Sequence, residues 1–294
     1  MTTRIEWTSA RRALVSLSAA SIALLACLLN DAAAAPAPRA GQVDIQYVPP
    51  KSNSLKPVYD YLRESRGLER VQETLAGLKL PRRLLIKAEG CNGESKAWYD
   101  GSDVTICYEF VDDIWKNAAT DTTANGLAPI DTVIGPFLDV VLHETAHAVF
   151  HILRIPLFGR EEDAADQLSA YLMLQTDKPA ARRLILGNAY QYKADLKPGG
   201  PAPALKSFAD VHGTPVQRFF NVLCIAYGAD PELFKDLTEK DYLPKDRAEG
   251  CVDEYRQVDY AFGKLIGPHL DTKRAAGQHK SYLPAPTVRL KRRQ

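Results

Sequence analysis

The stretch that decides the fold reads Pro136-Phe-Leu-Asp-Val-Val-Leu-His-Glu-Thr-Ala-His-Ala-Val-Phe-His-Ile-Leu153, and most of its residues are apolar. The polar residues Asp139, His143, His147 and His151 recur every four positions, so they form one stripe on a helix that is otherwise suited to burial. A buried polar stripe is stable only if its groups find partners. The sequence therefore predicts a core helix that carries a polar site.

Part of this helix, His143-Glu144-Thr145-Ala146-His147, is the His-Glu-x-x-His motif of zincin metallopeptidases. The two histidines lie one helical turn apart, so both imidazoles can bind one zinc ion, and Glu144 is placed to act as a general base. Two core histidines without a metal are the competing interpretation. The metzincin subclass is excluded, because it requires Gly and His where this chain has Phe150 and Leu153.

A third zinc ligand is predicted at the start of the next helix, in Glu161-Glu162-Asp163-Ala164-Ala165-Asp166. Glu162 and Asp166 are four residues apart and share a helix face, so Glu162 can bind zinc while Asp166 hydrogen-bonds a ligating histidine. This gluzincin arrangement is similar to the Glu-x-x-Ala-Asp element of several peptidase families. Glu161 and Asp163 are the alternative ligands. Acidic residues also favour a helix N-terminus without any metal.

The segment Asp210-Val-His-Gly-Thr-Pro-Val-Gln-Arg218 resembles the His-Gly-Thr-x-x-Gln-Arg segment of neutral zinc metallopeptidases. The resemblance implies that His212 donates to the developing oxyanion and that Arg218 orients either His212 or the region of Asp166. A histidine in a surface loop is the competing interpretation. His151 lies one turn beyond the predicted ligands, and we expect it to pack or to support them rather than to bind metal.

The chain as a whole resembles the DUF4344 family of bacterial metallopeptidases over about residues 55–270. The matching segments are Ala97–Asp100, Ile106–Glu109, His143–His147, Gly159–Asp166, His212–Gly213 and Gln217–Arg218. The resemblance implies a secreted zinc peptidase of zincin-like fold and supplies no substrate. In zincins an edge strand before the zinc helix takes an extended peptide, and Val104–Tyr108 is the candidate here. An ordinary sheet strand is the alternative interpretation of that segment.

The spacing of apolar residues along the rest of the chain predicts an α+β fold that is mainly helical, with a small antiparallel sheet. Strand-like runs cover residues 83–87, 97–99 and 104–108, and Asp100-Gly101 is typical of a turn between the last two. Helices are expected over residues 57–78, with a break near Gly67, and over 109–119, 132–153, 161–176, 179–193, 215–227 and 246–266.

The N-terminus is typical of a secretory signal peptide, because Arg4, Arg11 and Arg12 precede an uncharged run and an Ala-rich cleavage region. Cleavage after Ala34 would make the protein secreted or periplasmic. A lipoprotein modified at Cys27 and an uncleaved membrane anchor are the alternatives, and only these would give membrane contact. The predicted segments are the signal at 1–34, a Pro-rich linker at 35–56, the zincin-like domain at 57–270 and a basic, disordered tail at 271–294.

Outside the cytoplasm, Cys91, Cys107, Cys224 and Cys251 are expected to form two disulfides. Three pairings are possible, and pairing between neighbours, 91 with 107 and 224 with 251, is favoured. Reduced buried thiols are the alternative. Lys plus Arg (37) balances Asp plus Glu (36), which excludes a bulk electrostatic role such as nucleic-acid binding.

The predicted function is a zinc-dependent peptidase that hydrolyses peptide bonds in a peptide or protein substrate. Zn²⁺ bound by His143, His147 and Glu162 would lower the pKa of its water to about 7, and Glu144 would take the proton. A metal-dependent amidase of cell-wall peptides would use the same residues. A zincin-like binding protein with a structural metal, or with none, is the alternative from another class. The sequence indicates neither the substrate nor the oligomeric state.

Overall fold

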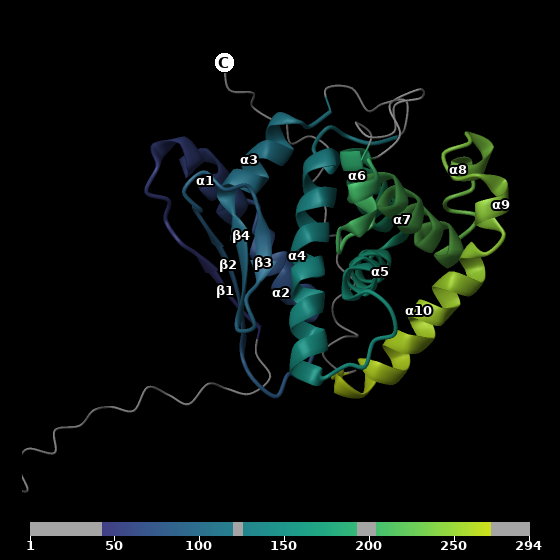
Figure 1. The fold of residues 1–294 in the computed structure, drawn as a ribbon. Helices are drawn as coiled ribbons and strands as arrows, with labels where there is room; N and C mark the ends of the chain where they lie inside the picture. Colours follow the sequence, from purple (N-terminus) through teal and green to yellow (C-terminus); the bar gives the residue numbers. More distant parts are fainter. Residues whose placement is uncertain (1–42, 120–125, 193–203, 272–294) are drawn as a thin grey trace, which may run out of the picture. The chain divides into compact units, whose positions relative to one another are not determined.

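The computed structural model describes residues 43–119, 126–192 and 204–271, all within one compact unit (Figure 1). The strands are β1 (Val43–Tyr47), β2 (Leu84–Glu89), β3 (Ala97–Tyr99) and β4 (Asp103–Cys107). The helices are α1 (Lys56–Glu64), α2 (Gly67–Leu75), α3 (Tyr108–Lys116), α4 (Asp131–Leu153), α5 (Glu161–Leu174), α6 (Lys178–Tyr190), α7 (Pro215–Ala229), α8 (Asp236–Glu239), α9 (Lys245–Ala248) and α10 (Cys251–Leu265). The prediction of a mainly helical α+β fold is confirmed. The predicted signal peptide and basic tail lie outside the described residues, apart from Asp271.

The four strands form a mixed sheet in the order β1-β2-β4-β3, which corrects the expectation of an antiparallel sheet. β1, β2 and β4 pair in parallel, and only the β3–β4 hairpin is antiparallel. The β1–β2 pair is parallel because α1 and α2 connect the two strands, and such a crossover returns the chain in its starting direction. The hairpin turns where predicted, with Asp100 accepting hydrogen bonds from the backbone of Ser102 and Asp103.

The strand that sequence reasoning missed is β1, which lies inside the predicted linker. Val43 is buried, and the hydroxyl of Tyr47 accepts a hydrogen bond from the Leu68 backbone and donates to Glu69 at 2.8 Å. These contacts fix β1 against α2. The described part of residues 35–56 is therefore a component of the fold, and its alternating Val43, Ile45 and Tyr47 were the available signal.

The order of the strands also changes which of them has a free edge. The predicted edge, Val104–Tyr108, corresponds mostly to β4, which pairs with β2 on one side and β3 on the other. Tyr108 is already the first residue of α3. The strands at the two edges are β1 and β3, and β3 contacts α4.

Helix α4 is the central element of the fold. It contacts β3 and β4 as well as α5 and α6, and Figure 1 shows it between the sheet and these helices. Its N-terminus is fixed by the buried Asp131, whose carboxylate accepts two hydrogen bonds from Arg183 on α6. The helix is long and apolar enough to cross a membrane, but 78% of that apolar window is buried inside the protein. It is therefore the core helix that its sequence predicts.

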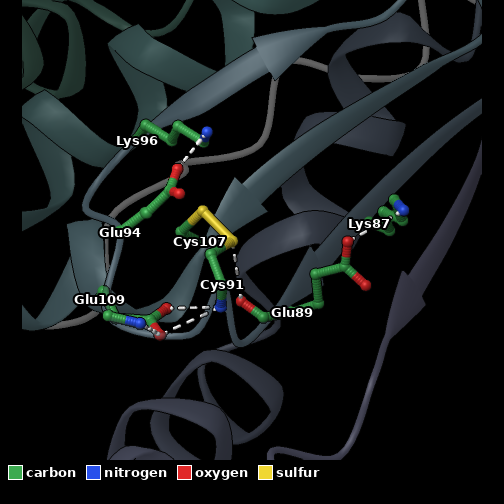
Figure 2. The surroundings of a disulfide bond; sticks show 8 residues. Lys87, Glu89, Cys91, Glu94, Lys96, Cys107 and Glu109 are labelled. Atoms are coloured by element: carbon green, nitrogen blue, oxygen red, sulfur yellow. Dashed lines mark hydrogen bonds and ion pairs between the residues drawn. A yellow bond between two sulfur atoms is a disulfide. The ribbon is translucent and has the colours of Figure 1, made fainter.

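Two disulfides connect neighbouring segments, Cys91 with Cys107 and Cys224 with Cys251, which confirms the predicted pairing. The first links the loop after β2 to the end of β4. Figure 2 shows the Glu109 carboxylate beside this bond, where it accepts hydrogen bonds from the backbone of Cys91 and Gly93. Two disulfides are compatible with an extracellular or periplasmic protein.

The contact between α4 and α6 depends on glycine. A Cβ at Gly187 would lie 2.1 Å from the carbonyl oxygen of Asp131, so the two helices would have to separate. We expect Gly187→Ala to lower the free energy of unfolding by about 3 kcal/mol, the upper end of the usual range for overpacking. Chemical denaturation monitored by circular dichroism measures this. Gly263→Ala on α10 is the matched control, because a Cβ there meets no atom within 4 Å. Equal losses in both variants would contradict this packing.

Candidate metal centre

Three of the predicted metal ligands meet between α4 and α5. His143 and His147 lie on α4, and their Nε2 atoms are 3.2 Å apart. Glu162, in the first turn of α5, places its Oε2 atom 3.0 Å from Nε2 of His143 and 3.3 Å from Nε2 of His147. Two ring nitrogens and one carboxylate oxygen therefore surround a single small space.

His212 reaches the same place from the loop before α7. Its Nε2 atom lies 2.9 Å from Oε2 of Glu162, and its ring stacks near that of His143 with 5.9 Å between centroids. The loop is fixed where it enters α7, because Thr214 forms a capping box with Gln217 and Pro215 occupies the first turn. The side chain of His212 is 42% exposed, against 5% for His143, so it is the outermost of the three histidines.

Each of the three histidines also contacts a carboxylate through its other ring nitrogen. Nδ1 of His143 lies 2.8 Å from Asp166, and Nδ1 of His147 lies 2.8 Å from Glu161. Nδ1 of His212 lies 3.3 Å from Asp210. A carboxylate at Nδ1 holds the proton there and leaves the Nε2 lone pair for a metal ion. Glu161, an alternative ligand in the sequence analysis, thus contacts a histidine instead, and sequence reasoning did not identify Asp210 as a partner.

The spacing of these donors fits a zinc ion. Zinc prefers nitrogen and oxygen ligands in a tetrahedron with bonds of about 2.0–2.1 Å, so neighbouring donor atoms should be about 3.3 Å apart. The three separations among His143, His147 and Glu162 are 3.0, 3.2 and 3.3 Å. His143, Glu162 and His212 also form a group whose donor atoms all lie within 4.8 Å of one another. The residues present therefore suit a metal ion with either three or four protein ligands.

A second layer of polar groups supports the histidines from inside the protein. Arg218 on α7 donates two hydrogen bonds to Asp166, at 2.7 and 2.8 Å, in the bidentate geometry that gives strong and directional pairing. Arg218 therefore contacts the Asp166 region, one of the two orientations the sequence left open. Asp139, the first residue of the polar stripe, accepts a hydrogen bond from Ser169 on α5. The buried stripe of α4 thus has partners on α5, and α7 supports one of these partners through Arg218.

The electrostatics follow from these contacts. Burial alone would lower the pKa of His143, but its hydrogen bonds to Asp166 and Glu162 raise it to about 10. The hydrogen bond from His143 lowers the pKa of Glu162 to about 2, and His212 and His147 act in the same direction. Without a metal, the centre therefore holds a charged carboxylate among imidazoles. A metal ion that binds at Nε2 of His143 has to displace the proton held there.

Glu144 lies on α4 beside the donors without contacting a histidine directly. It is half-buried, and this burial raises the pKa of its carboxyl. A backbone hydrogen bond from Tyr99 on β3 acts in the opposite direction. His151 is exposed and lies apart from the cluster, with its Nδ1 atom 2.9 Å from the Tyr99 hydroxyl. Tyr99 thus connects the edge strand to α4 twice, a link between distant residues that no local pattern in the sequence indicated.

One other group of possible metal ligands occurs among the described residues. It consists of Cys91, Cys107 and Glu109. The two sulfur atoms are bonded to each other, so neither is available as a thiolate, and the Glu109 carboxylate is occupied by backbone amides (Figure 2). We assign this group to the structure of the loop rather than to metal binding.

Comparison with known proteins gives one match. The model of family DUF4344, whose description reads "Putative metallopeptidase", matches residues 47–266. The match contains every donor of the candidate metal centre and both disulfides. Neither the curated proteins nor the solved structures contain a match.

The ligand assignment can be tested by measuring zinc affinity in variants. Glu162→Ala should abolish stable zinc binding, because it removes the oxygen on which the Nε2 atoms converge. Glu161→Gln and Asp166→Asn should retain zinc with affinity lowered by about 10–100-fold, the usual effect of losing a partner of a ligating histidine. Competition with a chromophoric chelator gives the affinities. Asp163→Asn, whose side chain pairs with Arg160, is the control. Loss of zinc in Glu161→Gln but not in Glu162→Ala would reverse the assignment.

Proposed function

We propose that this chain, which belongs to the DUF4344 family, is a zinc-dependent peptidase that hydrolyses peptide bonds. The observation that carries the proposal is the convergence of His143, His147 and Glu162 on one small space, with Glu144 beside it. Donors of this kind at this spacing suit zinc, and a nearby carboxylate outside the ligand set suits proton transfer.

Bound at these residues, zinc would polarise a substrate carbonyl and lower the pKa of a water molecule to about 7. Glu144 would take a proton from the attacking water and deliver it to the leaving amine nitrogen. A general base works best when its pKa lies closer to the operating pH than that of an ordinary carboxyl. Burial of Glu144 raises its pKa in that direction.

The free edge of β3 is the proposed binding site for the substrate backbone. Lys96 and Asp100 use their backbone groups to pair with β4. Along an antiparallel strand, the backbone N–H and C=O groups of successive residues point alternately toward and away from the partner strand. The backbone groups of Ala97 and Tyr99 therefore point away from β4. The backbone hydrogen bond from Tyr99 to Glu144 agrees with that direction. An extended peptide added to this edge would therefore run past the general base, as in strand addition to other sheets.

We further propose that His212 donates to the substrate oxygen that becomes negatively charged. Its Nε2 atom is within 2.9 Å of Glu162, and its exposure leaves it on the side that solvent and substrate can reach. As an imidazolium, His212 would donate from Nδ1 to Asp210, which would hold the ring in place, and from Nε2 to the substrate oxygen. A positioned donor of this kind typically contributes a factor of about 10²–10³ to the rate.

One observation favours a second candidate, a non-catalytic protein with a structural metal. If His212 binds the metal together with His143, His147 and Glu162, all four tetrahedral positions are taken by protein, as in structural zinc sites. A metal-dependent amidase of cell-wall peptides would use the same donors as a peptidase. Secretion through the N-terminal leader remains part of the proposal, and the two disulfides agree with it.

The first test separates the metal from the base. Glu144→Gln should retain about one zinc per chain, because Glu144 contacts none of the donors, while hydrolysis falls by roughly the 10²–10⁴ of a general base. Zinc is measured by atomic absorption, and cleavage is measured on a broad peptide library and on purified cell-wall peptides. Asp163→Asn is the control for both the zinc content and the cleavage activity. Full activity in Glu144→Gln, or a parent protein that binds no zinc, would contradict the mechanism.

The second test concerns His212. If it supports the oxyanion, His212→Ala should retain zinc and thermal stability while kcat/KM falls by roughly 10²–10³. The comparison variant is Asp210→Asn, which keeps the imidazole and removes only the charge at Nδ1, so its loss should be smaller. Zinc affinity, melting temperature and kcat/KM are measured together. Strongly weakened zinc binding in His212→Ala would identify His212 as a fourth metal ligand. Unchanged kinetics would show that His212 is a surface residue without a role in catalysis.

A further inference from the structure

The distribution of exposed apolar side chains on this protein is uneven. Among the described residues, six large hydrophobic side chains are exposed, and two of them are tyrosines with a polar hydroxyl. The other four are Phe158 at 106% exposure, Leu205 at 88%, Val211 at 64% and Phe208 at 54%. Single exposed apolar residues are ordinary, but a group of them marks a binding surface. All four lie in two short segments, the loop between α4 and α5 and the stretch before α7.

Both segments lead directly into the metal centre. Phe158 precedes Glu162 by four residues, so its Cα lies within about 14 Å of that of Glu162 even if the chain is fully extended. Val211 is the neighbour of His212, and His212 contacts Glu162 at 2.9 Å. The segments also approach each other at Gly213, where a Cβ would lie 3.8 Å from Oδ1 of Asp163. Phe158 and Val211 therefore lie near the catalytic space proposed above, and Leu205 and Phe208 precede Val211 in the same segment.

The structure holds the two segments in place. In the first, Ile155 and Leu157 pack against the hydrophobic core, which leaves Phe158 to face outward. In the second, the Asp210 carboxylate accepts a hydrogen bond from the His212 backbone, and the Thr214 capping box follows. The outward position of Phe158 and Val211 is thus set by their anchored neighbours. The backbone that carries these two side chains is therefore ordered before a ligand binds, which lowers the entropy cost of binding.

We propose that Phe158 and Val211, extended by Leu205 and Phe208, form an apolar collar that binds large apolar side chains of an extended peptide next to the scissile bond. The proposal rests on the proposed peptidase function and specifies its substrate class. An extended peptide advances about 3.3 Å per residue, so side chains one to four residues from the scissile bond fall within the 14 Å limit set for Phe158. A peptide added as a strand to β3 would leave its own side chains free to contact the collar.

The charges near the collar favour a peptide over a lipid surface. Surfaces that bind anionic lipid carry clusters of lysine and arginine. Residues 154–163 and 204–212 contain three basic and four acidic residues, namely Arg154, Arg160, Lys206, Glu161, Glu162, Asp163 and Asp210. With nearly equal numbers of basic and acidic residues, these segments do not attract anionic lipid. Binding of apolar peptide side chains does not depend on such an attraction.

The test measures binding without turnover, in zinc-loaded Glu144→Gln protein. Two fluorescein-labelled ten-residue peptides are compared by anisotropy, identical except that two central residues are Leu-Phe in one and Ser-Ser in the other. The Leu-Phe peptide should bind at least about 10-fold more tightly, the lower end of what an apolar pocket contributes. Adding Phe158→Ser and Val211→Ser should remove this difference, with zinc content and melting temperature unchanged. Tyr242→Ser is the control, because this exposed tyrosine lies outside both segments.

Three outcomes distinguish the possibilities. Equal binding of the two peptides, or a difference that survives Phe158→Ser and Val211→Ser, overturns the collar. Collar-dependent binding of vesicles of anionic phospholipid, without any difference between the peptides, overturns it in favour of a membrane surface. Selective binding of the Leu-Phe peptide that the parent enzyme does not cleave supports the collar and contradicts the peptidase function. Failure of the inference and failure of the proposed function are thereby separable.

Discussion

The candidate centre depends on one carboxylate oxygen, Oε2 of Glu162, which faces the Nε2 atoms of three imidazoles at 2.9–3.3 Å. This arrangement requires α5 to begin beside the middle of α4 and the loop before α7 to return to the same point. A shift of α5 by one turn would replace Glu162 by a different residue and leave the buried His143 without its partner. The geometry of the centre therefore depends directly on how α4, α5 and α7 pack together.

The buried stripe of α4 also explains why the core contains charge. Asp139 and His143 are almost inaccessible, and each would destabilise the fold if it had no partner. Ser169 and Asp166, both on α5, provide those partners, and Arg218 on α7 compensates the charge of Asp166. Three helices thus form a hydrogen-bonded network that orients His143, the proposed ligand, without a metal. In metal sites such supporting contacts determine ring orientation and affinity.

The sheet and the helices contribute different parts of the proposed machinery. The helices hold the donors, whereas the sheet provides an edge for a peptide backbone, and the two meet where Tyr99 of β3 approaches Glu144 of α4. The segments that precede Glu162 and His212 add exposed apolar side chains. The proposed ligands His143 and His147 and the proposed base Glu144 would therefore share α4, whereas substrate recognition would lie on β3 and in the loops before α5 and α7.

The sequence by itself determined the features that repeat within a few residues. The four-residue spacing of the histidines places them on one face of α4 whatever surrounds it, and the same holds for Glu162 and Asp166 on α5. Most helix bounds were predictable for this reason, although the helix expected over residues 246–266 is divided into α9 and α10. The disulfide pairs were predictable because each joins cysteines that are neighbours in the chain. Only the tertiary structure decided the parallel pairing of β1, the position of β3 at the edge, and the contacts of Glu161 and His212 with the centre. These features join residues that are distant in the chain, and their geometry is set by packing rather than by any local period.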